Sequence, residues 1–233
     1  MSEAELDRIR AAYAERDATL DNPYRWDNPG YVAYMQSVER SLLEALADAG
    51  VELAEARVLD VGCGTGYFLH RLGEYGAGEL HGIDLMENRV AEGRARYPKL
   101  DLRVGSAAEL PYEDGEFDLV TQFTCLSSIL DADVRLAAAR EMRRVARSGG
   151  WLLSLDMRRI RPLALRRSSG QTPTTGLDEA ELRRLFGEPA LLRRAAMRFD
   201  VAQVLRRHQL SVAALAKLPP LRSHFLGLWH LPA

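Results

Sequence analysis

Short apolar runs alternate with segments of helical periodicity along most of this chain. The apolar runs predict buried strands at 57–61, 79–84, 101–105, 117–122, 151–156, 193–200 and 223–230. The intervening segments place apolar residues about one helical turn apart, which predicts helices at 66–74, 87–97, 133–146, 178–186 and 201–217. Strands that alternate with helices in this way indicate an α/β fold with a parallel, doubly wound sheet.

Two helices are predicted before the first strand. The apolar stripe of the first contains Leu6, Ile9 and Tyr13, and the second ends at Gly50, a residue suited to a helix C-cap. A connector rich in Pro, Gly and Asn, DNPYRWDNPGY, lies between them. We expect a single domain over residues 1–233 with three parts: a helical cap (1–50), a cofactor-binding core (51–156) and a substrate-side loop with the completion of the sheet (157–233).

Residues 58–68 read VLDVGCGTGYF, an apolar strand that runs into a glycine-dense turn and then a helix. Gly62, Gly64 and Gly66 allow a tight turn in which a ligand can approach main-chain N–H groups. Asp84 lies 20 residues beyond Gly64, where a second parallel strand would present a carboxylate to ribose hydroxyls. The pattern favours a nucleoside ligand. The alternatives are a purely structural turn for the glycines and a helix N-cap for Asp84.

The spacing of the glycines discriminates between nucleoside ligands. The turn follows GxGxG, and Tyr67 stands where a dinucleotide-binding GxGxxG motif has its last glycine. Asp60 lies two residues before the first glycine, where its carboxylate would repel a pyrophosphate and attract an ammonium group. A nucleoside with a cationic amino-acid tail therefore fits better than NAD or FAD, and S-adenosylmethionine is such a ligand.

The glycine turn resembles motif I of class I S-adenosylmethionine-dependent methyltransferases, in the type-11 and type-25 style of small-molecule enzymes. GIDLMENRVAEGRARYP, VGSAAELPYEDGEFDLV and EMRRVARSGGWLLSLD resemble the next motifs in family order, so the resemblance covers 57–156. RSHFLGLWHLP resembles the last strand of a subset of the family. The resemblance implies a Rossmann-like, mostly parallel seven-stranded sheet with an antiparallel last strand, N-terminal helices and S-adenosylmethionine as cofactor.

The resemblance also implies which residues bind the cofactor. Ser106 and Ala107 stand where the family usually has Asp-Ala beside the adenine amino group, so a weaker contact is expected here. Gln122 and Phe123 end the fourth strand, where the family lines the cavity for cofactor and substrate. The full expected set is Asp60, Gly62, Cys63, Gly64, Gly66, Asp84, Leu85, Ser106, Ala107, Gln122 and Phe123.

Fewer signals mark the acceptor side. The aromatic residues of the connector either pack against the domain or cover the cavity, and His224 is the candidate general base if the final strand borders that cavity. No carboxylate ends the fourth strand, and Asp131 and Asp133 are interpreted as helix caps, so no metal is expected. The expected substrate pocket contains Tyr24, Trp26, Tyr31, Thr124, Asp156 and Arg158.

Composition limits the partners and the compartment. The net charge is −2, but residues 1–139 hold 13 Lys and Arg against 26 Asp and Glu, whereas residues 140–233 hold 18 against 7. The basic residues of 140–147 are interpreted as the solvated side of one helix, because no aromatic residues interleave them for base stacking. Two cysteines, a polar N-terminus and the lack of a long apolar run predict a cytoplasmic protein without a membrane span.

We therefore predict methyl transfer from S-adenosylmethionine to a small molecule, with a hydroxyl of a natural product or glycan as the acceptor by analogy. In-line displacement of a neutral leaving group requires mainly positioning and exclusion of water, which explains why no signature base is present. One alternative is an RNA or protein methyltransferase that uses the basic C-terminal half. Another is a cofactor-binding protein without transferase activity. The oligomeric state is left open.

Overall fold

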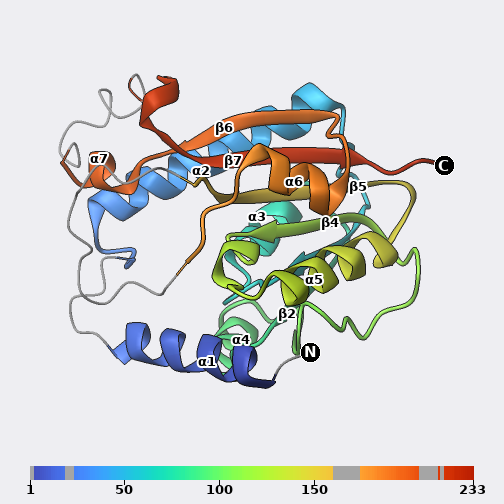
Figure 1. The fold of residues 1–233 in the computed structure, drawn as a ribbon, viewed down its shortest axis with the longest axis horizontal. Helices are drawn as coiled ribbons and strands as arrows, with labels where there is room; N and C mark the ends of the chain where they lie inside the picture. Colours follow the sequence, from blue (N-terminus) through green and yellow to red (C-terminus); the bar gives the residue numbers. More distant parts are fainter. Residues whose placement is uncertain (1–2, 19–23, 160–173, 205–214, 216–217) are drawn as a thin grey trace.

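Seven strands form one sheet through the middle of the molecule, with helices on both of its faces (Figure 1). The structure is a computed structural model that describes residues 3–18, 24–159, 174–204, 215 and 218–233. The strands are β1 (Arg57–Val61), β2 (Glu79–Asp84), β3 (Asp101–Val104), β4 (Phe117–Phe123), β5 (Ala146–Met157), β6 (Leu191–Met197) and β7 (Arg222–His230). Their order in the sheet is β3-β2-β1-β4-β5-β7-β6.

The direction of the strands confirms the predicted topology. β1 pairs in parallel with β2 and β4, β2 pairs in parallel with β3, and β4 pairs in parallel with β5. β7 lies antiparallel between β5 and β6. The chain order reverses between β1 and β4, and ligands of open α/β sheets bind at the carboxyl ends of the strands beside such a reversal. The fold thus places the expected site after β1 and β4.

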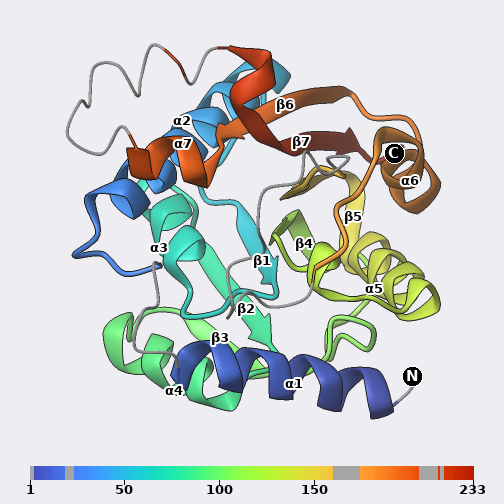
Figure 2. The same cartoon turned by 60° about the vertical axis from the view of Figure 1, so that its left-hand side comes forward.

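Helices cover both faces of the sheet (Figure 2). Two apolar clusters attach them to it. One cluster joins the sheet to α2, α3 and α4, and the other joins it to α5, α6 and one residue of α1, Ile9. The helices are α1 (Glu3–Ala18), α2 (Pro29–Ala49), α3 (Tyr67–Glu74), α4 (Glu87–Arg96), α5 (Ala132–Val145), α6 (Glu179–Phe186), α7 (Phe199–Val204) and the 3-10 turns η1 (Leu126–Ser128) and η2 (Pro219–Leu221). Within the described ranges, no helix is both long enough and apolar enough to span a bilayer.

Local sequence explains where several helices begin and end. The Asn28 side chain accepts a hydrogen bond from the Gly30 N–H at 2.9 Å, and Pro29 occupies the first turn of α2, where its missing N–H is harmless. Gly50 ends α2 with φ of 68°, as its predicted role as a C-cap requires. Asp131 accepts hydrogen bonds from the N–H groups of Asp133 and Val134, which confirms its predicted role as the cap of α5.

Several element boundaries differ from the sequence-based expectation. α2 begins at Pro29, so Tyr31 lies on this helix rather than in the connector. β5 begins at Ala146 rather than near 151, because Ala146 pairs with Phe117 ahead of a register shift. β6 covers Leu191–Met197 and the next helix starts at Phe199. Residues 19–23, which include the first three residues of the connector, lie outside the described residues, as do the loop at 160–173 and the expected helical residues 205–214 and 216–217.

Candidate active site

A cavity of about 1060 Å³ lies at the carboxyl ends of β1, β2 and β4. The turns that follow these strands form one side of it, and α1 and α2 cover it from the N-terminal part of the chain. Residues from β7 and from the segment around α7 close the far end. One cavity therefore joins the glycine turn to the C-terminal part of the sheet.

The glycine turn needs residues without a side chain for two different reasons. Gly62 has φ of 75°, and a Cβ atom there would come within 2.6 Å of the Cys125 sulfur. Gly64 has φ of 56°, borders the cavity, and would place a Cβ atom in open space. Gly66 does not line the cavity; its absent Cβ allows Leu100 to approach α3. Gly66 thus has a packing role, and its expected contact with the cofactor stays a prediction.

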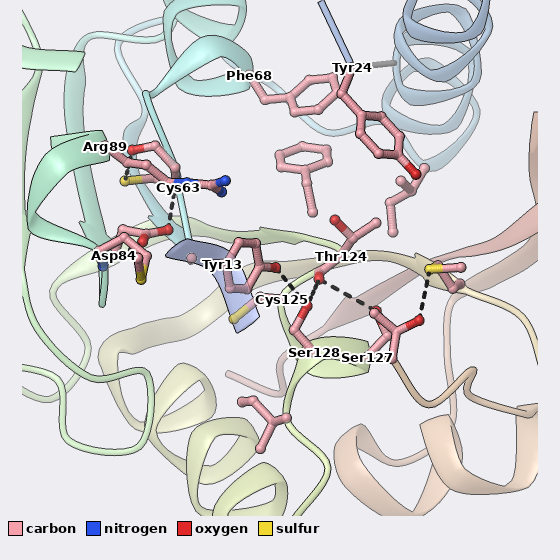
Figure 3. A pocket seen from close by; sticks show the side chains of 18 of the residues that line it. Tyr13, Tyr24, Cys63, Phe68, Asp84, Arg89, Thr124, Cys125, Ser127 and Ser128 are labelled. Carbon is pink, nitrogen blue, oxygen red and sulfur yellow. Dashed lines mark hydrogen bonds between the residues drawn. The ribbon is translucent and has the colours of Figure 1, made fainter. Parts of the chain in front are cut away.

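Asp84 links the glycine turn to the end of β2 (Figure 3). Its Oδ2 accepts the Gly64 N–H at 2.8 Å, and its Oδ1 accepts the Met86 N–H at 2.9 Å. A carboxylate has about four lone-pair sites, so both oxygens retain the capacity to accept ribose hydroxyls. Met86 rather than Asp84 is the N-cap residue of α4. The Asp84 carboxylate therefore holds the turn in shape and also lines the cavity.

Asp60 is a buried acid at the bottom of the cavity. It is 2% exposed, and its Oδ1 accepts the Thr121 hydroxyl at 2.8 Å. Burial raises its pKa to about 8, with a smaller contribution from the negative charge of Asp84. A nearby cation would stabilise its carboxylate form. Asp60 thus has the environment expected of a residue that receives an ammonium group.

Substituting Asp60→Asn is expected to flatten the pH dependence of the free energy of unfolding. Folding raises the pKa of Asp60 from 3.8 to about 8, so the folded state binds more protons than the unfolded state between these values. Stability contributed by this group is therefore lost as pH rises through that window, by at most about 1.4 kcal/mol per pH unit. Urea unfolding of both proteins from pH 5 to 8 measures the difference. Parallel curves for the two proteins would contradict the proposed environment of Asp60.

The end of β4 turns sharply beside the glycine turn. Thr124 has φ of 58°, an unfavourable value for a β-branched residue that is typical of functional sites. Its N–H donates to the Leu155 carbonyl at 2.8 Å, and its carbonyl accepts the hydroxyls of Ser127 and Ser128 (Figure 3). These contacts hold the strained residue at the cavity wall.

Gln122 and Asp156 support this turn from behind and do not line the cavity. Gln122 Oε1 accepts the Cys125 N–H at 2.8 Å, and its amide donates to Asp156 Oδ2 at 3.2 Å. Asp156 also accepts the Ser127 N–H, and burial raises its pKa to about 6. The structure therefore gives these two residues a supporting place behind the cavity wall, and their expected contact with cofactor or substrate stays a prediction.

α1 covers the cofactor end of the cavity and is fixed at several points. Glu5 is 8% exposed and accepts the Leu130 N–H at 2.6 Å, and Arg8 donates to the Ser128 carbonyl at 2.7 Å. The Tyr13 hydroxyl lies 2.8 Å from Ser128 Oγ (Figure 3). The apolar stripe of Leu6, Ile9 and Tyr13 predicts an amphipathic helix but gives no sign that this helix borders the site. All three residues line the cavity.

Aromatic side chains form the acceptor end of the cavity. Tyr24 stacks on Phe199 with ring centroids 5.0 Å apart, and Tyr34 lies edge-on to Phe199 at 5.7 Å. Tyr31 stacks on Tyr34 at 6.4 Å, and all four rings line the cavity. Tyr34 is not among the residues that the sequence predicts for the pocket. It follows Tyr31 by three positions on the same helix, a spacing that places both side chains on one face and could have indicated its role.

The structure brings most of the expected residues together and leaves out five. Trp26 packs on Tyr31 and Tyr67 outside the cavity lining, and Arg158 donates to the Arg222 carbonyl instead of reaching the cavity. Gly66, Gln122 and Asp156 are the other three, as described above. The expected residues that do line the cavity are Asp60, Gly62, Cys63, Gly64, Asp84, Leu85, Ser106, Ala107, Phe123, Tyr24, Tyr31, Thr124 and His224.

The residues at the glycine end fit S-adenosylmethionine. Asp60 offers a buried acid that could receive the ammonium group, and Asp84 offers oxygens that could accept ribose hydroxyls. Gly64 leaves open space where a side chain would intrude. Among the described residues, no group of three or more His, Cys, Asp and Glu side chains is placed to hold a metal ion.

Comparison with known sequences matches residues 58–150 to the methyltransferase domain family. A probable S-adenosylmethionine-dependent methyltransferase of Mycolicibacterium smegmatis is 38% identical over 103 residues, which cover 44% of this chain and 38% of that protein. A demethylmenaquinone methyltransferase of Bacillus subtilis is 34% identical over 108 residues, which cover 43% of this chain and 45% of that protein. This chain thus spans less than half the length of these curated relatives.

Comparison with solved structures supports the same fold. An S-adenosylmethionine-dependent methyltransferase from Mesorhizobium loti superposes with a TM-score of 0.60 at 18% identity, over 79% of this chain and 95% of that one. The segment matched by the family contains both the glycine turn and Asp84, which face one cavity here. Residues 58–150 thus match a methyltransferase domain, and sequence, fold and site together support a class I S-adenosylmethionine-dependent methyltransferase with S-adenosylmethionine as its cofactor.

Proposed function

We propose that this chain transfers a methyl group from S-adenosylmethionine to a hydroxyl of a small, largely apolar acceptor, such as a natural product. The observation that carries the proposal is the shared cavity, in which the glycine turn and Asp84 lie at one end and an aromatic wall at the other. Ligand cavities usually measure roughly 300–1000 Å³, so about 1060 Å³ is sufficient for a cofactor and a second molecule.

The chain's own residues would supply binding, orientation and exclusion of water. When bound, the cofactor supplies a methyl carbon activated by a sulfonium. Asp60 and Asp84 would hold the amino-acid and ribose groups, and α1 covers this end through Glu5 and Tyr13. Aromatic rings would orient an apolar acceptor and keep water away from the sulfonium. This division of labour requires no metal and no covalent intermediate.

Calorimetric titration tests the first half of the proposal. We expect micromolar-scale affinity for S-adenosylmethionine and for S-adenosylhomocysteine, and no measurable binding of NAD. The reason is that Asp60 is placed to attract an ammonium group and to repel a pyrophosphate. Incubation with methyl-labelled cofactor and fractionated metabolites, followed by mass spectrometry, tests the second half. Binding of NAD in preference to S-adenosylmethionine would refute the assignment.

A nucleic-acid acceptor is the main alternative, and the contacts of the arginines at 143–147 disfavour it. Contrary to the prediction, these arginines do not all lie on one helix, because α5 ends at Val145 and Arg147 lies on β5. Arg143 donates to the Phe186 carbonyl, Arg144 pairs with Glu141 and Asp114, and Arg147 pairs with Asp118. These guanidinium groups are therefore already used inside the molecule. A salt-sensitive shift of RNA in gels at moderate ionic strength would instead support the alternative.

A further inference from the structure

Tyr34 on α2 and His224 on β7 meet at the acceptor end of the cavity, which both residues line. Tyr34 Oη lies 3.2 Å from His224 Nε2. His224 Nδ1 lies 2.9 Å from the hydroxyl oxygen of Ser223, the preceding residue. Both ring nitrogens of His224 are therefore engaged, and His224 is only 4% exposed.

Ser223 determines which nitrogen carries the proton. The Ser223 hydroxyl is directed to the Met197 carbonyl at 3.4 Å, so its oxygen is available to accept the His224 Nδ1–H. Nε2 is then an acceptor, and it receives the phenolic proton of Tyr34. Burial lowers the pKa of His224 to about 4, so the ring is neutral at physiological pH and its Nε2 lone pair is free to accept the Tyr34 hydrogen bond.

We propose that Tyr34 is the catalytic residue that contacts the acceptor hydroxyl, and that His224, positioned by Ser223, receives the proton through Tyr34. Because His224 Nε2 is occupied by Tyr34, an acceptor in the cavity meets the Tyr34 oxygen rather than the imidazole. This inference rests on the proposed function and deepens it. It identifies the acceptor as a hydroxyl compound, with a phenol as the best match to the surrounding rings.

The transfer of protons and electrons balances within these groups. A bond forms between the acceptor oxygen and the methyl carbon, while the carbon–sulfur bond breaks and leaves its electron pair on sulfur. The acceptor proton moves to Tyr34 Oη as the phenolic proton moves to His224 Nε2. The positive charge lost at sulfur therefore resides on the imidazolium, which returns its extra proton to solvent after the product leaves.

The groups around the pair keep Tyr34 protonated before methyl transfer begins. Two other cavity residues from the N-terminal part of the chain, Tyr24 and Tyr31, lie near Tyr34. Arg198 and Asp200 form an ion pair and also line the cavity. Asp156 on β5, opposite Phe225 in the β5–β7 pairing, supplies a buried carboxyl near Tyr34. Burial raises the pKa of Tyr34 far above its ordinary value, so the residue is a neutral phenol before transfer.

Nitrogen-15 NMR of the histidine rings tests the relay without any acceptor. In the wild type at pH 7 we expect His224 to be the neutral Nδ1–H tautomer. Tyr34→Phe removes the hydrogen bond to Nε2 and should shift the resonance of that nitrogen. The control is Tyr97→Phe, because Tyr97 stacks on another histidine, His70, at 4.4 Å outside the cavity lining. This control should leave the His224 signals unchanged.

Binding of a matched pair of probes tests the contact with the acceptor. With S-adenosylhomocysteine present, 4-cyanophenol and benzonitrile are titrated into the wild type and into Tyr34→Phe. We expect the variant to lose about fivefold in affinity for 4-cyanophenol, the effect of one hydrogen bond, and to bind benzonitrile as before. His224→Gln, which accepts the Tyr34 hydrogen bond but takes up no proton, should still bind the phenol.

Each outcome decides a different part of the proposal. An Nε2–H tautomer in the wild type, or equal losses of both probes in Tyr34→Phe, overturns the relay. Absence of 4-cyanophenol binding to the wild type overturns the assignment of a phenolic acceptor. If the wild type fails to bind S-adenosylhomocysteine, the proposed methyl transfer fails first. Tight binding of that ligand together with an Nε2–H tautomer refutes only the relay.

Discussion

Substituting Asp84→Ala is expected to weaken binding of S-adenosylmethionine by about 10- to 100-fold, or about 1.5–3 kcal/mol, the scale for hydrogen bonds to a charged group. The variant loses the acceptors for the ribose hydroxyls. It also frees the N–H groups of Gly64 and Met86, which the carboxylate holds in place at present. Calorimetric titration of the purified variant measures the change, and thermal unfolding shows whether the fold survives.

Asp101→Ala is the matched control for this substitution. Asp101 lies on the neighbouring strand β3, pairs with Arg103 and His81, and does not line the cavity. Its loss should leave cofactor affinity unchanged. Asp84→Asn keeps one oxygen as an acceptor, so its affinity should fall between the wild type and Asp84→Ala. A folded Asp84→Ala protein with unaltered affinity would reduce Asp84 to a support of the turn.

The strands that the sequence predicted best are those in which an apolar run ends at residues that also require a turn. Apolar runs with glycine or acidic residues at their ends located β1, β2 and β4 within about one residue. Gly62 and Gly64 could be identified as site residues because a tight turn beside a ligand requires glycine for conformational reasons. The antiparallel last strand followed from family resemblance, since no pattern of residues specifies strand direction.

Gln122 and Asp156 lie outside the cavity lining for a shared geometric reason. Successive side chains of a strand point to opposite faces, and the last residues can face either the cavity or the neighbouring strand. Phe123 lines the cavity, whereas Gln122 points to Ser154 and Asp156 inside the sheet layer. The sequence does not reveal which side chains of this turn face the cavity, because Thr124 leaves the strand with a left-handed backbone conformation. Proximity in sequence to a site therefore did not establish contact with it.

Contacts between distant segments were also beyond sequence reasoning. Tyr34 and His224 are separated by 190 positions, and only the docking of α2 beside β7 brings them together. Arg135 makes further contacts that the sequence does not predict, because an arginine in a helix is normally expected to be exposed to solvent. It is 3% exposed in the structure, on the buried side of α5. Its surroundings indicate that it organises the turn that carries Ser127 and Ser128.

Arg135 connects three segments through one guanidinium group. Its Nε donates to the carbonyls of Leu126 at 3.2 Å and Ile129 at 3.0 Å, and its Nη1 pairs with Glu181 on α6. The turn held in this way bears Ser127 and Ser128 at the cavity wall, and Ser128 is where α1 docks. Removing the Arg135 guanidinium would thus lower the stability of the fold and alter the shape of the cavity wall.

Substituting Arg135→Met is expected to lower the free energy of unfolding by about 3–5 kcal/mol, because two carbonyls lose their buried donor and Glu181 keeps only its exposed partners, Arg159 and Arg184. Arg140→Met, an exposed position on the same helix, should change stability by no more than about 0.5 kcal/mol. Adding Glu181→Gln to Arg135→Met should recover part of the loss, since the buried carboxylate that has lost its buried partner is then removed. Urea unfolding of the four proteins measures these differences, and a loss below about 1 kcal/mol in Arg135→Met would show that the turn is held by other contacts.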